Sequence, residues 1–281
     1  DKFTLWLEAF PLLRRDAQST TDALRRFLGT PATPGVLYSD GAGELQAAAQ
    51  MCGLVHHVST PDRPQTNGVA EQAVGRVIEG TRCLLYQSGL ATMWWAWAAR
   101  CFCVLRNLSD KVREGMTPYQ LRHGAEFAGQ LIPFGAGVRY KAQSVRVGVD
   151  PHPFGPKLLP GIFAGYHFHS GGKWSGDYFV IDWTQYEHDP HSATLKPVRV
   201  KEVVVSDPLA FPLQPPERIT VPSDIMRLAE LAREDVVRSV QRESSGHTGG
   251  PPDPVIHHEP ASGSGILRPK DHWELTQDWL I

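Results

Sequence analysis

Hydrophobic and polar positions in the first 110 residues follow two alternating periods. Period-two patterns predict a strand over residues 1–10, ending at Pro11, and short buried strands over 36–39 and 54–58. Helical periods predict helices over residues 16–28, 45–52, 68–87 and 90–107. Gly29, Gly53 and Gly89 follow the first three of these stretches as stop signals. This order of strands and helices is typical of a three-layer α/β domain.

The pattern changes beyond residue 133, where short β-type segments are separated by Gly, Pro and Asp. These segments cover residues 137–142, 161–168, 178–183 and 198–206. They predict a small antiparallel barrel or curled sheet. The run SGGKWSG over 170–176 is compatible with a phosphate-binding nest or a hairpin turn. Its place between two strand-like segments favours the hairpin.

The rest of the chain has few core-forming residues. One amphipathic helix is predicted within residues 222–242, and the Gly-, Pro- and Ser-rich residues 244–265 are expected to be a disordered linker. The final RPKDHWELTQDWLI is aromatic, but its pattern indicates no function. The predicted division is a core over 1–112, a connector over 113–130, a β domain over 131–206, a linker with one amphipathic helix over 207–243, and a mostly disordered acidic tail over 244–281.

Length and composition fit a globular protein that is not inserted in a membrane. The 281 residues carry a net charge of −2, and the longest apolar run, over 93–105, is too short for a bilayer and contains Arg100. We identify no signal peptide and expect no membrane partner. The first residue is Asp rather than Met, so we expect a fragment or a processed piece of a longer chain.

The charge balance differs along the chain. Basic residues outnumber acidic ones 13 to 12 over 1–130 and 8 to 6 over 131–206, whereas acidic residues outnumber basic ones 12 to 7 over 207–281. This balance neither requires nor excludes nucleic-acid binding, because a local basic groove is sufficient.

The four cysteines indicate neither a zinc finger nor a disulfide framework, because they form no C-x-x-C pair. Cys52, His56 and His57 imitate three metal ligands, but no fourth ligand stands at a suitable spacing. A helix end followed by a strand explains these residues better.

Two acids are candidates for chemistry. Asp40 follows a hydrophobic strand, where α/β folds usually place reactive groups, although capping of the next helix also explains an Asp there. Glu71 opens a helix behind a loop rich in turn-forming residues, and complementing the helix dipole is its ordinary explanation. That loop holds the polar side chains of Gln65 and Asn67 near Glu71, as expected of a ligand-binding loop.

Two carboxylates from separate elements suit a hard cation such as Mg²⁺. With a third acid they suit two-metal phosphodiester chemistry. On a helix, Arg82 lies within about 20° of Glu71, and Arg76 lies to one side. Arg76 and Arg82 are therefore candidate phosphate contacts, with an ordinary solvated charge as the alternative for each.

Two blocks carry a resemblance to a known family. YSDGAGEL over 38–45 and GLVHHVSTPDRPQTNGVAE over 53–71 resemble the integrase core of long-terminal-repeat retroelements. DKFTLWLEAFP over 1–11 and the helix over 95–107 are similar to other core segments of that family. TPYQLRHG over 117–124, IPFGAGVRY over 132–140 and PGIFAGY over 160–166 resemble the small SH3-like domain that follows the core in copia-type polyproteins.

The resemblance implies a partial ribonuclease-H-like α/β core, an SH3-like antiparallel β domain and a disordered tail. It implies Mg²⁺ (or Mn²⁺) bound by Asp40 and Glu71, with Gln65, Asn67, Arg76 and Arg82 near DNA. The implied reaction is 3′-end processing and strand transfer, with element ends and target DNA as partners. A homo-oligomer, when active, and a nuclear location are implied as well.

The sequence also departs from the family. The family's first catalytic aspartate belongs to a strand before residue 1, and Asp1 is not that residue. Gly41 and Gln72 replace residues usual in the family, and the interval between Asp40 and Glu71 is short. These departures leave open an alternative in which the chain is a catalytically inactive, integrase-derived nucleic-acid-binding or interaction protein.

Overall fold

A computed structural model describes residues 1–29, 35–59, 64–141, 157–192, 194–214 and 274–276. One structural unit comprises Asp1–Gln214 with His272–Ile281. The helix expected over 222–242 and the linker expected over 244–265 lie outside the described residues. No helix in the described part of the chain is long and apolar enough to cross a membrane.

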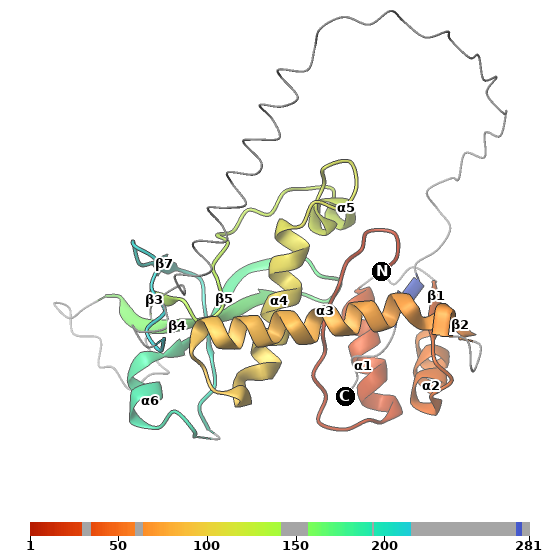
Figure 1. Ribbon diagram of the computed structural model, residues 1–281, viewed down its shortest axis with the longest axis horizontal. Helices are drawn as coiled ribbons and strands as arrows, with labels where there is room; N and C mark the ends of the chain where they lie inside the picture. Colours follow the sequence, from red (N-terminus) through yellow and green to blue (C-terminus); the bar gives the residue numbers. More distant parts are fainter. Residues whose placement is uncertain (30–34, 60–63, 142–156, 193, 215–273, 277–281) are drawn as a thin grey trace, which may run out of the picture. The chain divides into compact units, whose positions relative to one another are not determined.

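The first part of the chain alternates helices and strands, as the sequence predicts (Figure 1). Its elements are α1 (Ala17–Leu28), β1 (Val36–Ser39), α2 (Gly43–Cys52), β2 (Val55–Val58), α3 (Pro64–Ser88), the 3₁₀ turn η1 (Thr92–Trp94), α4 (Trp95–Ser109) and α5 (Pro118–His123). Asp16 caps α1 by accepting the Ser19 N–H at 2.8 Å, and Gly29 ends it at φ +78°. The end of α2 at Cys52 and the strand β2 confirm the explanation of Cys52, His56 and His57 as a helix end and a strand.

A three-stranded parallel sheet has the order β2-β1-β8. Strand β1 is central, with Val36 opposite Val55 of β2 on one side. On the other side Val36 lies opposite Glu274 of β8 (Glu274–Thr276). A segment far along the chain therefore occupies the edge of β1 that β2 leaves open.

The later strands form a five-stranded antiparallel sheet in the order β6-β5-β4-β3-β7. Its elements are β3 (Gly137–Tyr140), β4 (Leu159–Phe168), β5 (Trp174–Asp182), β6 (Val198–Val200) and β7 (Val203–Val205), with α6 (Trp183–His188) after β5. The two edge strands are joined by only Lys201 and Glu202, so the Cα atoms of Val200 and Val203 are at most about 11 Å apart. The edges of a flat five-stranded sheet would be roughly 19 Å apart. The sheet therefore curls until its edges approach, which confirms the predicted curled sheet.

The loop over 169–173 confirms the predicted hairpin. It joins β4 to β5, and the His169 N–H donates to the Lys173 carbonyl at 2.9 Å. The Gly171 N–H donates to the carbonyl of Arg26 at the end of α1, at 2.7 Å. Arg122 of α5 donates through Nε to the Gly171 carbonyl at 3.0 Å. Hydrogen bonds from the hairpin thus connect the curled sheet to α1 and α5.

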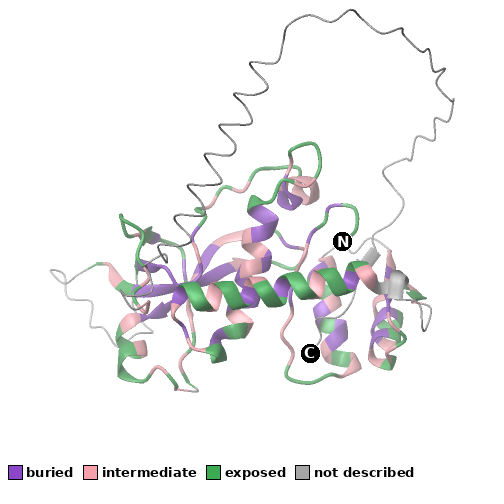
Figure 2. Ribbon diagram, in the orientation of Figure 1, coloured by how far each residue is buried: buried purple, intermediate pink, exposed green. Residues whose placement is uncertain are grey.

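Helix α4 lies at the centre of the packing. Ala98 and Cys101 belong to the main hydrophobic cluster with the inner residues of the curled sheet, while Ala99 and Cys103 pack with Ala9 and Val77. The neighbouring α3 approaches α4 so closely that a Cβ on Gly80 would lie 2.1 Å from the Phe102 ring. Figure 2 shows exposed residues along the length of α3, in contrast to the buried interior of the curled sheet.

The predicted strand over 1–10 is wrong. Residues 2–4 form a turn, and no part of the segment joins a sheet. The Asp1 carboxylate accepts the Phe3 N–H at 2.9 Å and the Thr4 hydroxyl at 2.6 Å, which stabilises that turn. Further on, the Leu7 N–H donates to Oδ1 of Asn107 at 3.0 Å, and Nδ2 of Asn107 donates to the Leu7 carbonyl at 2.6 Å. An amide side chain of α4 therefore replaces the neighbouring strand that the pattern implied.

Other boundaries also differ from expectation. Helix α3 begins at Pro64 rather than at 68, because proline is favoured in the first turn, where its missing N–H costs nothing. The helix expected over 90–107 begins as the 3₁₀ turn η1 and continues as α4 to Ser109. Strand β5 starts at Trp174 and gives way to α6 at Trp183, where Asp182 caps the helix by accepting the Gln185 N–H at 2.9 Å.

We expect Asn107→Ala to lower the free energy of unfolding by about 2–4 kcal/mol, because two backbone groups of Leu7 lose their partners in a largely buried place. Urea denaturation measures this change. Ser109→Ala is the matched control: its hydroxyl donates to Leu105 at an exposed position two residues further on. Equal losses in the two variants would contradict the role assigned to Asn107.

The packing of the hairpin against Trp6 predicts different losses of stability when two glycines with similar positive φ are replaced by alanine. Gly172 and Gly176 have φ of +81° and +85°, but a Cβ on Gly172 would lie 2.6 Å from the Trp6 ring, whereas a Cβ on Gly176 would meet nothing within 4 Å. We expect Gly172→Ala to lower the thermal midpoint several degrees more than Gly176→Ala. Similar midpoints for both variants would show that Trp6 does not pack on the hairpin.

Candidate functional site

Asp40 stands directly after β1, the central strand of the parallel sheet. Its carboxylate accepts the Ala42 N–H at 3.1 Å, so it organises the turn that leads into α2. The N-cap position of α2 is Ala42, not Asp40, so Asp40 is not the capping residue of that helix. Asp40 is partly exposed at the edge of the sheet where the parallel strands end. Reactive groups of open α/β sheets gather at this edge.

Ser39 and His56 connect the ends of β1 and β2 beneath Asp40. The Ser39 hydroxyl lies 2.5 Å from Nε2 of His56 and donates to the Asp40 carbonyl at 2.9 Å. The Ser59 N–H donates to the Ser39 carbonyl at 2.8 Å. Burial lowers the pKa of His56 below its ordinary value of 6.5, and the nearby Asp40 carboxylate opposes this shift. His56 is thus mainly neutral at neutral pH and acts as a hydrogen-bonding partner at this edge.

Glu71 lies on the exposed side of α3. Since α3 begins at Pro64, Glu71 is the eighth residue of the helix and lies beyond its first turn. The helix dipole acts within the first turn, so it does not explain this acid. Ile78 and Arg82 each lie within about 20° of Glu71 around the helix, and all three residues are exposed. The buried residues Ala70, Val77, Thr81 and Ser88 form a narrow stripe on another side of α3.

Gln65 and Asn67 belong to the first turns of α3, because the helix starts at Pro64. The expectation that they stand in a loop before the helix is wrong in this respect. Their side chains lie outside the described residues.

Arg76 and Arg82 are both exposed on α3, and no ion pair involving either occurs among the described residues. Arg76 lies close enough to the buried Arg106 for its charge to help lower the pKa of that guanidinium, after the larger effect of burial. Two arginines and the two glutamates Glu71 and Glu79 give the exposed side of α3 no net charge. Binding of DNA phosphates along α3 would therefore be favoured by a cation near the acids.

The structure brings Asp40 together with Ser39 and His56, and it presents Glu71, Arg76 and Arg82 on one exposed helix. Among the described residues, no group of three His, Cys, Asp or Glu side chains is arranged to hold a metal ion. The donor chemistry nevertheless fits Mg²⁺, since Asp40 and Glu71 offer carboxylate oxygens at partly or fully exposed positions.

Sequence reasoning missed a second polar group around Glu8. Glu8 lines a cleft with Arg100 of α4 and with His167 of β4. Burial raises the pKa of the Glu8 carboxyl, which accepts a hydrogen bond from Nε1 of Trp6 at 3.3 Å. An acid inside the hydrophobic run LWLEAF was the available signal, because a charged residue in such a run needs a polar partner.

Comparison with known proteins yields distant structural likenesses only. No family model matches the chain, and no curated protein matches it. A chain in the cryo-electron microscopy structure of the simian T-cell lymphotropic virus intasome in complex with PP2A regulatory subunit B56 gamma is similar to it with a TM-score of 0.33 and 14% identity. The match covers 69% of this chain and 65% of that chain. A TM-score at this level supports no argument about function.

The effect of the Asp40 charge on His56 predicts a measurable coupling. In Asp40→Asn the pKa of His56 should fall further below 6.5, because the carboxylate that opposes the effect of burial is gone. An NMR titration of the His56 ring measures this pKa. Asp110→Asn, an exposed acid of the α4 end, serves as the control and should leave it unchanged. A His56 pKa that is the same with and without the Asp40 carboxylate would contradict the geometry.

Proposed function

We propose that the chain is the integrase region of a copia-type long-terminal-repeat retrotransposon and that it binds DNA for metal-dependent phosphodiester transfer. Its first part would be a ribonuclease-H-like core, and its curled sheet would be the SH3-like domain. The proposal combines the sequence blocks over 38–45 and 53–71 with the positions of their acids.

The observation that carries the proposal is the place of Asp40, immediately beyond the central strand β1 of a parallel sheet. This is the edge of an open α/β sheet at which ligands usually bind, beyond the carboxyl ends of the parallel strands. Glu71 supports the proposal because its position in α3 is explained neither by capping nor by the helix dipole.

Asp40 and Glu71 would hold Mg²⁺ or Mn²⁺ through their carboxylate oxygens. When bound, the ion activates the attacking oxygen and stabilises the leaving oxygen of a phosphodiester. The exposed Arg76 and Arg82 would hold the DNA backbone along α3, and Gln65 and Asn67 would lie near the DNA at the start of that helix. Element ends and target DNA would be the substrates, and a nuclear homo-oligomer would be the active form.

Metal binding and DNA binding can be tested separately because the proposal assigns them to different residues. We expect Asp40→Asn and Glu71→Gln to abolish Mn²⁺ binding, measured by electron paramagnetic resonance, while DNA binding at high salt is retained. We expect the double variant Arg76→Ala/Arg82→Ala to bind Mn²⁺ normally but to bind duplex DNA roughly tenfold more weakly. Its slope of log affinity against log salt should be smaller by about 1.8, since two phosphate contacts are lost.

Arg14→Ala is the matched control for the arginine variants, because Arg14 is exposed and lies outside α3. Undiminished Mn²⁺ binding in both acid variants would refute the metal site. Normal DNA binding in the α3 double variant would refute the DNA interface. DNA binding by the unaltered chain without any Mn²⁺ binding would favour the alternative of a catalytically inactive, integrase-derived DNA-binding protein.

A further inference from the structure

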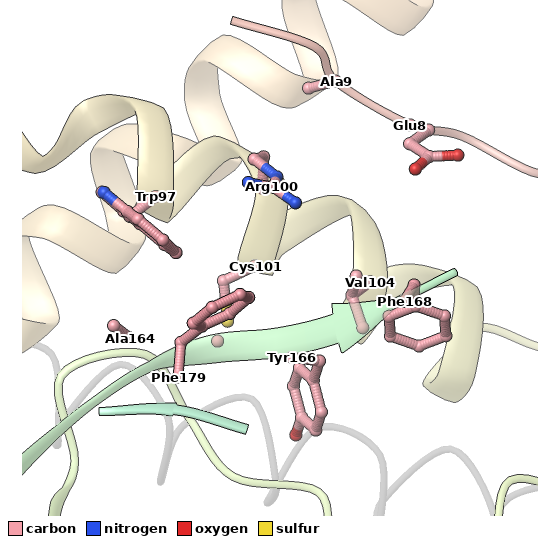
Figure 3. A pocket seen from close by; sticks show the side chains of 11 residues that line it. Glu8, Ala9, Trp97, Arg100, Cys101, Val104, Ala164, Tyr166, Phe168 and Phe179 are labelled. Carbon is pink, nitrogen blue, oxygen red and sulfur yellow. The ribbon is translucent and has the colours of Figure 1, made fainter. Parts of the chain in front are cut away.

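A polar cleft lies between the segment after Leu7, helices α1 and α4, and strands β4 and β5. Its outer part has a volume of about 610 Å³ and is lined by residues from all of these elements. A smaller adjoining part of about 40 Å³ shares Glu8, Arg100, Phe168 and Phe179 with this outer part. Figure 3 shows Arg100 between Trp97 and Glu8, with Phe179, Tyr166 and Phe168 on the strands beside it. None of the residues assigned to metal or DNA binding above lines this cleft.

Basic side chains reach this cleft from three directions. Arg26 comes from the last turn of α1, Arg100 from α4, and His167 and His169 from the end of β4 and its hairpin. Neither Arg26 nor Arg100 forms an ion pair with any residue that the structure describes. The His167 and His169 rings lie 5.7 Å apart and meet edge to face. Two permanent cations therefore face the same hollow, which the acids Glu8 and Asp22 also line.

Two acids, Glu8 and Asp22, also line the cleft. Burial raises the pKa of Glu8, which favours its protonated form more than at an exposed position. Asp22 lies on α1 and accepts a hydrogen bond from Gln18 one turn earlier, at 3.1 Å. A Glu8 whose charged form is disfavoured by burial leaves more of the arginine charge available to an anionic ligand.

Aromatic side chains provide a surface for a flat group beside the cations. Phe10, Phe168 and Phe179 line the outer part, and the Phe179 ring packs edge to face on Trp97 at 5.0 Å. The wall is fixed in place, because the carbonyl of Arg26 accepts the Gly171 N–H of the hairpin. A volume of about 610 Å³ is in the usual range for pockets that bind small molecules.

We propose that this cleft binds a nucleotide. Arg26 and Arg100 would bind its phosphate, and its base would pack against Phe168 and Phe179. Two ligands carry such a phosphate: a free mononucleotide, and one nucleotide within a single DNA strand. Proteins that bind single-stranded DNA combine the same two features: cationic side chains that contact the backbone and aromatic side chains on which the bases stack. The inference does not depend on Asp40, Glu71, Arg76 or Arg82.

The test is a calorimetric titration of the full chain with deoxyadenosine monophosphate, deoxyadenosine, inorganic phosphate and a short single-stranded oligonucleotide. We expect the monophosphate to bind at least tenfold more tightly than deoxyadenosine. Arg26→Gln/Arg100→Gln should weaken monophosphate binding about tenfold or more, because charge-assisted hydrogen bonds to the phosphate are lost. Arg25→Gln, the adjacent exposed arginine of α1 that does not line the cleft, should leave it unchanged.

Glu8→Gln should tighten monophosphate binding, because it removes an opposing carboxyl group. A folding defect would not tighten binding, so this variant excludes misfolding as the cause of the arginine result.

Tighter binding of the oligonucleotide than of the monophosphate, lost in Arg26→Gln/Arg100→Gln, identifies a DNA strand as the ligand. The reverse order of affinities identifies a free nucleotide. Three outcomes would overturn the proposal. The monophosphate and deoxyadenosine could bind with equal affinity, Arg25→Gln could weaken binding as much as Arg26→Gln/Arg100→Gln, or no phosphate compound could bind at millimolar concentration. Each of these outcomes is independent of the Mn²⁺ and duplex measurements.

Discussion

The buried amide of Asn107 is the interaction on which the arrangement of the first part depends. It satisfies both backbone groups of Leu7, and the neighbouring Arg106 donates through a guanidinium N–H to the Leu5 carbonyl at 2.9 Å. Without a neighbouring strand, these groups would otherwise be left without partners, at a cost of about 1–3 kcal/mol for each buried group. The segment that follows Leu7 is thereby placed along α4, where Glu8 meets Arg100 and forms one wall of the cleft.

Helix α4 packs against both the curled sheet and α3 because apolar residues lie on more than one of its sides. Its small residues Ala98 and Cys101 allow the curled sheet to approach, and Ala99 and Cys103 allow the contact with α3. Burial raises the pKa of both cysteine thiols, so they behave as small apolar groups rather than as nucleophiles. The hairpin over 169–173 adds a polar attachment to α1 and α5. Both candidate sites depend on this packing, one at the end of β1 and the other where the curled sheet meets α4.

The two candidate sites differ in how they combine charge with exposure. Asp40 and Glu71 stand at exposed or partly exposed positions, where a carboxylate is accessible to a hydrated cation. Burial raises the pKa of Glu8 and disfavours its charged form, although the nearby Arg122 and Arg100 oppose this effect. The same residue type therefore favours a cation at one site and permits an anion at the other.

The sequence by itself determined α1, β1, α2, β2 and the β character of the later strands, because periodicity and glycine stops are local properties. It also placed Asp40 at a strand end and Glu71 on a helix. The pairing of Leu7 with Asn107 rather than with a strand depends on the packing of α4, since alternation cannot specify the hydrogen-bonding partner. Only the tertiary structure decided the start of α3 and the convergence of Arg26, Arg100 and His167, because residues on separate elements meet only when helices and sheet pack together.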